Sequence, residues 1–449
     1  MSSIKLIISD LHLADGHAIL DSFGDVQQAA LEGLLAATRI GGPLGRADDI
    51  ELIINGDCFD FLATAPYDTE GVSDVSTAMA KLHKIMAAHG PFLEALRQFI
   101  GPTGHHVTFI TGNHDLELRF KEVRGELGRA IVGEQVEGKV FFCPARFYRP
   151  MRDVYIEHGN AYDFWNSPMG GLWDEHGQPV ELDPKTIMLP VGSHYFQHAA
   201  HPISIRYAYF DRFEPSMNTM RQLALLCLLN PEIVIETAKL TMDLFSEPRR
   251  ALTGLAEGEE QVLTKLFEHT MMDFVAFQQE MAARKGESWD EAGEGKGSEV
   301  EANHLMEFAM LPEALNLPLV EAVAAICTPT IYQMGEGVAA GMRGVLNNDP
   351  QLRYAIAGHT HMVRIETVGN GAQSYLNTAS WTTRLALPAP GEVNAALVEW
   401  LRHPDWDRVP LRDVTQLIFA MINSTTDGPS SASLCVWEGG TRGSYSVLA

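Results

Sequence analysis

The stretch LIINGDCFD, residues 52–60, decides the fold, and its centre is the carboxylate of Asp57. The largely apolar run 50–54 predicts a buried strand, and Asn55-Gly56 predicts a sharp turn at its end. Asp57 is therefore expected on a loop at the carboxyl end of a strand. Ligand sites of open α/β sheets lie at such ends, so this position makes Asp57 a candidate for binding or catalysis.

Four more apolar runs lead into polar side chains in the same way. They span residues 4–9, 106–110, 153–157 and 353–357, and each predicts a short strand. The metal-competent side chains after the five strands are Asp10, His12, Asp57, Asn113, His158, His359 and His361. One such residue is usually an ordinary loop residue, but their joint recurrence favours a shared site.

These side chains form a ligand set with a definite metal preference. Imidazole nitrogens combined with carboxylate and amide oxygens suit Mn, Fe or Zn better than Mg or Ca alone. We expect two divalent ions, Mn first, with Fe, Zn or Mg as alternatives. If Asp57 bridges them, one ion has Asp10, His12, Asp57 and His361, and the other has Asp57, Asn113, His158 and His359.

Five motifs in a fixed order resemble the calcineurin-like metallophosphoesterase superfamily. They are DLH at Asp10, GDCFD at Gly56, GNHD at Gly112, HGN at His158 and GHTH at Gly358. The resemblance covers roughly residues 1–166 and 351–400. It implies an α/β fold, a four-layer αββα sandwich of two facing mixed sheets with a large helical insertion, and the same pairing of ligands around two metal ions.

The resemblance also implies a reaction, the hydrolysis of a phosphoester. Two ions about 3.5–4 Å apart lower the pKa of a water between them towards about 7, and the resulting hydroxide attacks phosphorus. His114, which no ion needs, is expected to protonate the leaving alkoxide, an effect worth roughly a hundred- to ten-thousand-fold. Asp60 and Asp115 are expected to orient His114 and the ligands as hydrogen-bond acceptors.

A narrower resemblance concerns bacterial UDP-2,3-diacylglucosamine pyrophosphatases and related phosphoesterases. The chain is similar to them in YDFWN at 162–166, in NTASW at 377–381 and in having helices after the HGN motif. In those enzymes the insertion caps the site and holds acyl chains. This chain departs from them because His114 stands where they typically have Arg and because its insertion is longer. The expected substrate class is therefore a phosphorylated small molecule, nucleotide or lipid.

Several functions remain open within this framework. We expect a phosphodiesterase or pyrophosphatase by analogy with the family. A phosphomonoesterase or a nuclease of the same superfamily is an alternative, and a nuclease predicts a basic groove. The net charge of -25 disfavours nucleic acid as a partner. A scaffold that lost catalysis is the alternative from another class, against which the complete ligand set and His114 argue.

The chain is expected to divide into four segments. Helices are predicted at 25–40 and 76–99. Residues 161–349 carry most of the acidic excess, and we expect them to form a mostly helical insertion that acts as a cap or as the interface of a homo-oligomer. The expected segments are 1–160 as the first part of the core, 161–349 as the insertion, 350–402 as the second part of the core, and 403–449 as a C-terminal extension with one helix near 411–422.

The composition indicates an ordinary soluble protein. The 449 residues are 46% hydrophobic and 20% charged, and the five cysteines are scattered without a Cys-x-x-Cys pair. This favours reduced thiols in the cytoplasm over structural zinc. The chain begins with a predicted strand in place of a signal peptide, and no apolar run approaches the length that spans a membrane.

Four further patterns allow two interpretations each. The triplet His194, His198 and His201 would share one helical face, as a metal site or, as we favour, as a polar helix near the site. Arg146, Arg149 and Arg152 could hold a substrate phosphate, although solvated charges are favoured. The stretch 217–229 is expected to be helical core in preference to a lipid groove. Trp165 and Trp173 fit a cleft wall as well as a buried anchor, and 286–297 is a candidate surface loop.

Overall fold

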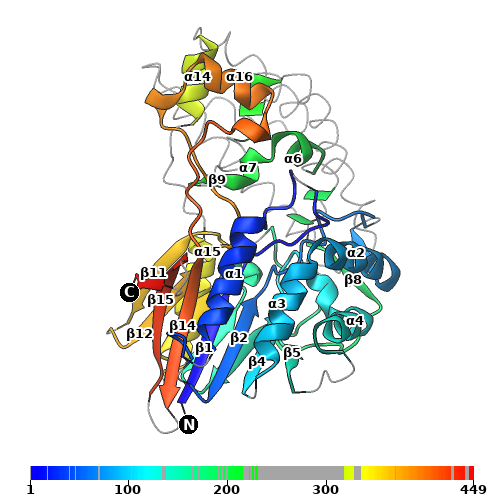
Figure 1. Cartoon of the computed structure of the whole chain (residues 1–449), viewed down its shortest axis with the longest axis vertical. Coiled ribbons are helices and arrows are strands. Elements are labelled where there is room, and N and C mark those ends of the chain that lie inside the picture. The colour runs from blue at the N-terminus through cyan, green and yellow to red at the C-terminus, as the bar shows by residue number, and fades with distance from the viewer. Residues whose placement is uncertain are drawn as a thin grey trace, which may run out of the picture. The chain divides into compact units, whose positions relative to one another are not determined.

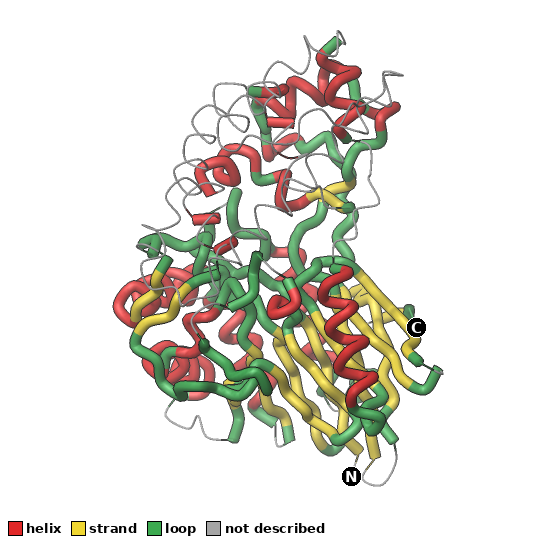
Figure 2. The backbone as a smooth tube through the Cα atoms, turned by 180° about the vertical axis from the view of Figure 1, so that it is seen from behind, coloured by secondary structure: helices red, strands yellow, loops and turns green. Residues whose placement is uncertain are grey.

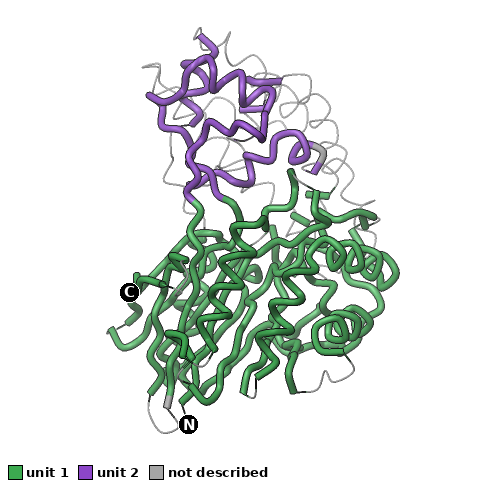
Figure 3. Tube along the Cα trace, viewed as in Figure 1, with its two compact units in different colours: residues 1–197, 333–383, 415–449 green, residues 198–332, 384–414 purple. Residues whose placement is uncertain are grey.

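The computed structural model describes residues 2–230 and 318–448, except for 18, 40, 46, 69–70, 103, 134–137, 164, 169–170, 191, 194–195, 198–200, 216–221, 223–224, 227, 328–334, 370, 426–428 and 440–443. The chain forms two compact units (Figure 3). Unit 1 contains Met1–Gln197, Gln333–Thr383 and Thr415–Ala449, and unit 2 contains His198–Tyr332 and Arg384–Val414.

The larger sheet of unit 1 is mixed. Its order in the described chain is β16-β15-β14-β1-β2-β4-β5. The parallel part consists of β1 (Ser2–Ile8), β2 (Asp49–Asn55), β4 (His105–Ile110) and β5 (Val140–Phe142). The antiparallel part consists of β14 (Ile418–Thr425), β15 (Ser431–Gly439) and β16 (Ser444–Val447).

The second sheet of unit 1 is mixed as well, in the order β11-β12-β10-β7-β6. Its parallel centre is formed by β7 (Val154–Glu157), β10 (Tyr354–Ala357) and β12 (Gln373–Thr378). The edge strands β6 (Phe147–Met151) and β11 (Val363–Val368) run antiparallel to their neighbours. A small antiparallel pair joins β3 (Val72–Asp74) to β8 (Thr186–Met188).

Side-chain alternation in the first sheet separates two cores. Leu6 and Leu52 belong to the cluster that includes residues of α1 (Asp25–Ala37), α2 (Val75–Ala88), α3 (Gly90–Ile100) and α4 (Lys121–Val132). Ile7 and Ile53 point to the other face and share a cluster with Ile156 and Ile356 of the second sheet. Both faces of the parallel strands are therefore buried, which explains their continuous apolar runs. Figure 1 shows α1 and α3 across the strands β1, β2 and β4.

The outer face of the second sheet is covered by α15 (Glu336–Asn348). Val338 and Met342 of this helix share a buried cluster with Tyr155 of β7 and Tyr375 of β12. Figure 2 shows the molecule from this reverse side. The described parts of unit 1 therefore follow the order helices, sheet, sheet, helix.

Unit 2 has a separate core of aliphatic and aromatic side chains. Its elements are α6 (His201–Tyr207), α7 (Tyr209–Arg212), β9 (Phe213–Glu214), α14 (Leu319–Ile326), β13 (Leu385–Ala386), η4 (Pro390–Glu392), α16 (Ala395–Arg402) and η5 (Trp406–Arg408). Tyr209, Phe213, Val323, Leu397 and Trp400 are buried together. The stretch 217–229 contributes buried leucines to this core at its described positions, which agrees with the expected role as core.

The α/β class with mixed sheets is confirmed, as are the five strands that precede the candidate ligands. The single helix expected at 76–99 is two helices, because the chain breaks at His89 before Gly90-Pro91. The helix expected near 411–422 is wrong: residues 418–425 form β14. This strand is buried on both faces: one face packs on the second sheet through Ile418, Ala420 and Ile422, and the other packs on the helices through Phe419 and Met421. A strand of this kind is apolar at every position, so its sequence resembles that of an apolar helix.

The units follow other boundaries than the expected segments. Residues 161–197 and α15 belong to unit 1, residues 384–414 belong to unit 2, and residues 415–449 supply three strands of the first sheet. The candidate loop 286–297, His194 and His198 lie outside the described residues. Within the described part of the chain, no helix has the length and apolar character needed to cross a membrane.

Candidate metal centre

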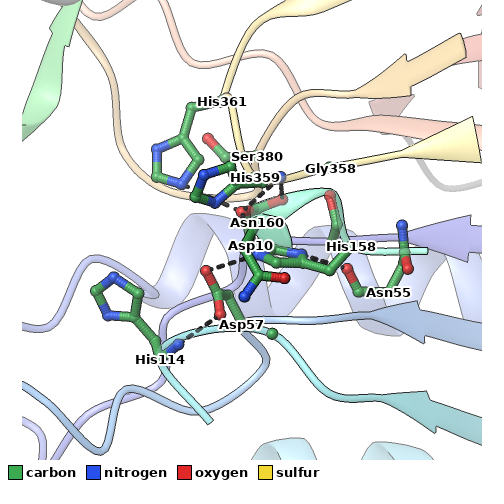
Figure 4. A network of polar contacts seen from close by, with 12 residues as sticks. Asp10, Asn55, Asp57, His114, His158, Asn160, Gly358, His359, His361 and Ser380 are labelled. Atoms are coloured by element: carbon green, nitrogen blue, oxygen red, sulfur yellow. Dashed lines mark hydrogen bonds and ion pairs between the residues drawn. The ribbon is translucent and has the colours of Figure 1, made fainter. Parts of the chain in front are cut away.

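The seven candidate ligands come together at the carboxyl ends of parallel strands. Asp10 and His12 follow β1, Asp57 follows β2, and Asn113 follows β4 in the first sheet. His158 follows β7, and His359 and His361 follow β10 in the second sheet. Figure 4 shows side chains from both sheets turned towards one another around Asp10 and Asp57.

Most of these residues have a strained backbone. Positive φ is uncommon for residues other than glycine. In the described chain it occurs at Asp10 (55°), His12 (51°), Asp57 (50°), His359 (68°), His361 (56°) and Ala379 (56°). All but Ala379 are candidate ligands. Strain of this kind persists where the surroundings impose it and is concentrated at functional sites.

The glycines of the motifs leave room for the ligand side chains. A Cβ atom on Gly112 would clash with the carboxylate of Asp57, and one on Gly358 would clash with Ser9 and Asp10. Gly56 has φ of 80° and is packed against the ring of His158. Three candidate ligands follow a glycine. Space requires the glycine at Gly112 and Gly358, and both space and backbone conformation require it at Gly56.

The first group of candidate ligands is Asp10, His12 and His361. Nε2 of His361 lies 3.2 Å from Nε2 of His12 and 3.2 Å from Oδ1 of Asp10. His12 Nδ1 lies 3.1 Å from Oδ2 of Asp60, which makes Nδ1 the protonated nitrogen and leaves the lone pair on Nε2. A carboxylate and imidazole nitrogens thus converge as they would around one cation.

The second group is Asp57, His158 and His359. Nε2 of His158 lies 3.0 Å from Oδ2 of Asp57, and its Nδ1 lies 2.9 Å from the carbonyl oxygen of Asn55. That carbonyl oxygen can only accept a hydrogen bond, so Nδ1 of His158 carries the proton and Nε2 of the neutral ring keeps its lone pair for a metal. Asn113 is 2% exposed, and its Oδ1 accepts no hydrogen bond within the described part of the chain.

Asp57 lies between the two groups. Its Oδ2 is 3.0 Å from Nε2 of His158 and 3.9 Å from Nε2 of His12, so one carboxylate reaches histidines of both groups. Its Oδ1 accepts the backbone N–H of His114 at 2.8 Å. This position is the one expected of a bridging carboxylate.

Asp60 connects His12 with His114. Its Oδ2 contacts His12, and its Oδ1 lies 3.1 Å from Nδ1 of His114. Burial favours the neutral imidazole, but the charges of Asp60 and Asp57 outweigh it and raise the pKa of His114 to about 9. His114 is therefore protonated at neutral pH, with Nδ1–H directed to Asp60 and Nε2–H available for donation.

Asp115 acts on the backbone. Its two carboxylate oxygens accept the N–H of Cys58 at 2.8 Å and the N–H of Gly112 at 2.6 Å. It therefore ties the loop after β2 to the loop after β4. Burial and the charge of Asp57 raise the pKa of Asp115 to about 7.

The charge of the site depends on its occupancy. Burial opposes ionisation of Asp57, but the charges of His158 and His114 lower its pKa well below the usual value. Burial likewise opposes protonation of His158, but Asp57 and Asp10 raise its pKa to about 10. A metal at this position would displace that proton, so metal binding should be linked to proton release.

No known family model matches this chain. No curated protein shows significant sequence similarity to it either.

The remaining candidates have other partners. Arg146 forms an ion pair with Glu157, Arg149 with Asp349, and Arg152 donates to Gln351. Trp173 donates to the carbonyl oxygen of Pro144 and stacks beneath Arg119, so it anchors its own segment.

Sequence reasoning missed one residue that contacts the site. Asp163, within the YDFWN stretch, places Oδ2 2.8 Å from Nε2 of His359. The only signal in the sequence was its position shortly after the HGN motif.

The donor set fits divalent transition metals. The N and O chemistry that Mn, Fe or Zn requires is supplied by the imidazole nitrogens of His12 and His361, the acceptor Oδ1 of Asn113 and the buried carboxylates of Asp10 and Asp57. The two groups would hold one ion each, with Asp57 shared.

Proposed function

We propose that the chain is a phosphoester hydrolase with a dinuclear metal centre, of the calcineurin-like metallophosphoesterase type. The observation that carries the proposal is the backbone strain at Asp10, His12, Asp57, His359 and His361. The same residues form two groups of metal-competent atoms that meet at Asp57. The order of layers in unit 1 is compatible with the four-layer αββα sandwich that the motifs imply.

Within this proposal the chain holds its metals through Asp10, His12 and His361 on one side and Asn113, His158 and His359 on the other. When bound, two such ions activate a water and neutralise phosphoryl oxygens. His114 donates the proton at Nε2 to the leaving oxygen, and Asp60 orients it through Nδ1. Asp57 accepts the backbone N–H of His114 and so fixes that residue beside the candidate ligands.

The proposed substrate is a phosphodiester or a pyrophosphate. Hydrolysis of either expels an oxygen leaving group that a protonated His114 beside the site can protonate, as hydrolysis of a monoester also does. This preference follows the family analogy, and no residue of the site selects it on its own.

The proposal is tested by adding metals back to metal-stripped protein. Bis-p-nitrophenyl phosphate and p-nitrophenyl phosphate are offered with Mn²⁺, Fe²⁺, Zn²⁺ or Mg²⁺ in separate reactions. We expect turnover of the diester, fastest with Mn²⁺, and no turnover without metal. Faster turnover of the monoester would replace the diesterase proposal by a phosphatase. Absence of turnover with two ions bound would overturn the proposed hydrolase activity.

A further inference from the structure

Asp163 holds one of the candidate ligands from outside the metal site. Its Oδ2 lies 2.8 Å from Nε2 of His359. The same carboxylate accepts the backbone N–H of Trp165 at 3.0 Å and the side-chain amide of Asn166 at 2.8 Å. The backbone N–H of His359 in turn donates to both oxygens of Asp10, at 3.1 and 3.0 Å. His359 is thus fixed at its backbone and at its ring.

The contact determines which nitrogen of His359 is available to a metal. An ionised carboxylate only accepts hydrogen bonds, so Nε2 carries the proton and Nδ1 carries the lone pair. His359 lies with His158 in the second group, as Figure 4 shows.

The segment that presents Asp163 is packed rigidly. Tyr162 ends the short helix η2 (Asn160–Tyr162) immediately before Asp163. A Cβ atom on Gly341 of α15 would clash with the Tyr162 ring, and one on Gly337 would clash with its carbonyl oxygen. The guanidinium of Arg146 lies 5.8 Å from the centre of the same ring. These contacts locate Asp163 before any ion binds.

Asp163 has a counterpart on the other side of the site. Asp60 contacts Nδ1 of His12, a member of the first group, and Asp163 contacts Nε2 of His359, a member of the second. Each group therefore has one histidine whose free nitrogen is selected by an outer carboxylate. Partners of this kind orient the ligand, increase its basicity and raise metal affinity.

We propose that Asp163 is the positioning residue of the second group, where it sets His359 to bind through Nδ1 and so controls the affinity of one of the two metal ions. The inference rests on the proposed dinuclear centre. Loss of the carboxylate should lower the affinity for one ion by about tenfold to a hundredfold and leave the affinity for the other unchanged.

The test is calorimetric titration of the metal-stripped full chain with Mn²⁺. The wild type should bind two ions, and Asp163→Ala should bind one of them tenfold to a hundredfold more weakly. Asp163→Asn, which can still accept the Trp165 N–H and so preserve the turn, should show a smaller loss of the same ion. If the alanine variant does not fold, the asparagine variant alone tests the proposal.

A matched control comes from Asp174. This aspartate accepts the backbone N–H of His176 at 2.9 Å and of Gln178 at 2.8 Å in a similar turn. Asp174→Ala removes a turn-forming carboxylate outside both groups of candidate ligands and should leave both affinities unchanged. Electron paramagnetic resonance adds a second readout, recorded with two Mn²⁺ added per chain and no excess. The wild type should show the signal of a coupled Mn²⁺ pair, whereas Asp163→Ala should show the signal of an isolated ion.

The outcomes separate this inference from the proposed function. Two ions in the wild type and unchanged affinities in both Asp163 variants would overturn the positioning role alone. Equal weakening of both ions in a folded Asp163→Asn variant would also overturn it, because the effect would not be confined to the second group. Failure of the wild type to bind two ions would overturn the dinuclear centre and this inference with it.

Discussion

The candidate ligands hold their strained backbones through hydrogen bonds within the protein. The N–H of Asp10 donates to the carbonyl oxygen of Gly56 at 3.1 Å, and the N–H of His12 donates to that of Asp57 at 3.0 Å. The N–H of Trp381 donates to Asp10 from the other side. Residues in such conformations cost on the order of 1–3 kcal/mol each. Hydrogen bonds within the protein therefore hold these loops in the conformation that brings the candidate ligands together.

Asp57 and His114 should give different phenotypes when each is replaced by alanine. Asp57→Ala removes the carboxylate shared by both groups, so bound metal and diesterase activity should be lost together. His114→Ala removes only the proton donor, so both ions should stay while kcat falls roughly a hundred- to ten-thousand-fold. Metal content by elemental analysis and kcat on the diester check this. Equal metal loss in both variants would contradict the assigned roles.

The glycine before His359 offers a test of crowding at the site. In Gly358→Ala the added methyl group meets Ser9 and the carboxylate of Asp10, so both side chains must shift. We expect a loss of about 1–3 kcal/mol in unfolding free energy and weaker Mn²⁺ binding. Gly90→Ala is the control, because a Cβ atom there meets nothing within 4 Å. Unchanged Mn²⁺ affinity in Gly358→Ala would refute the close packing of this loop.

Among the elements, the strands that carry ligands were predictable and β14 was not. Short apolar runs that end in polar residues gave β1, β2, β4, β7 and β10 within a residue or two. The apolar residues of the segment 411–422 suit both a buried strand and a helix, and the polar residues that follow at 423–425 include neither histidine nor aspartate to mark the end of a strand. The positions of the candidate ligands could be predicted from the motifs, because each candidate ligand lies within a few residues of the carboxyl end of its strand.

Asp163 shows what local pattern cannot supply. Its partner His359 lies 196 positions away in the chain, and the contact requires β7 and β10 to be neighbours in the second sheet. No local spacing encodes that pairing. The same reason hid the link from Asp115 to Cys58, since it spans the ends of two different strands.

Two glycines of α15 provide a matched pair at the scale of the element. Gly344→Ala meets nothing within 4 Å, so it should stabilise the helix by about 0.5–1 kcal/mol. Gly341→Ala gains the same helix propensity but drives a methyl group into the ring of Tyr162, which should cost about 1–3 kcal/mol. Urea unfolding midpoints should therefore shift in opposite directions. A stabilised Gly341→Ala would contradict the packing of α15 on Tyr162.

At the scale of the whole molecule, unit 1 contains a buried ionic cluster apart from the candidate site. Lys81 and Asp68 form an ion pair with side chains inaccessible to solvent. Ser73 donates to Glu117 at 3.0 Å, and Gln197 donates to Asp68 at 2.8 Å. Burial raises the pKa of Glu117 from 4.5 to about 7, which the charge of Lys81 only partly opposes.

This raised pKa makes stability depend on pH. The folded chain keeps the proton of Glu117 up to about pH 7, whereas an unfolded glutamate loses it near 4.5. The free energy of unfolding that this pKa shift contributes is fully present below pH 4.5 and is lost as the pH rises through 7. The loss is on the order of 3 kcal/mol. Glu117→Gln mimics the protonated group and should not show this decline. Unfolding free energies from pH 4 to pH 8 compare the two proteins.

The exposed carboxylate of Glu122, which pairs with Lys185, is the control for that comparison. Glu122→Gln should follow the wild type at every pH, because exposed ion pairs contribute little. A wild type and a Glu117→Gln variant with parallel pH profiles would show that Glu117 titrates normally in the folded chain.

The dinuclear centre is tested most directly by anomalous diffraction from crystals soaked in Mn²⁺. The account predicts two anomalous peaks about 3.5–4 Å apart on either side of the Asp57 carboxylate. One peak should lie beside Asp10, His12 and His361, and the other beside Asn113, His158 and His359. A single peak, or two peaks that do not share Asp57, would contradict it.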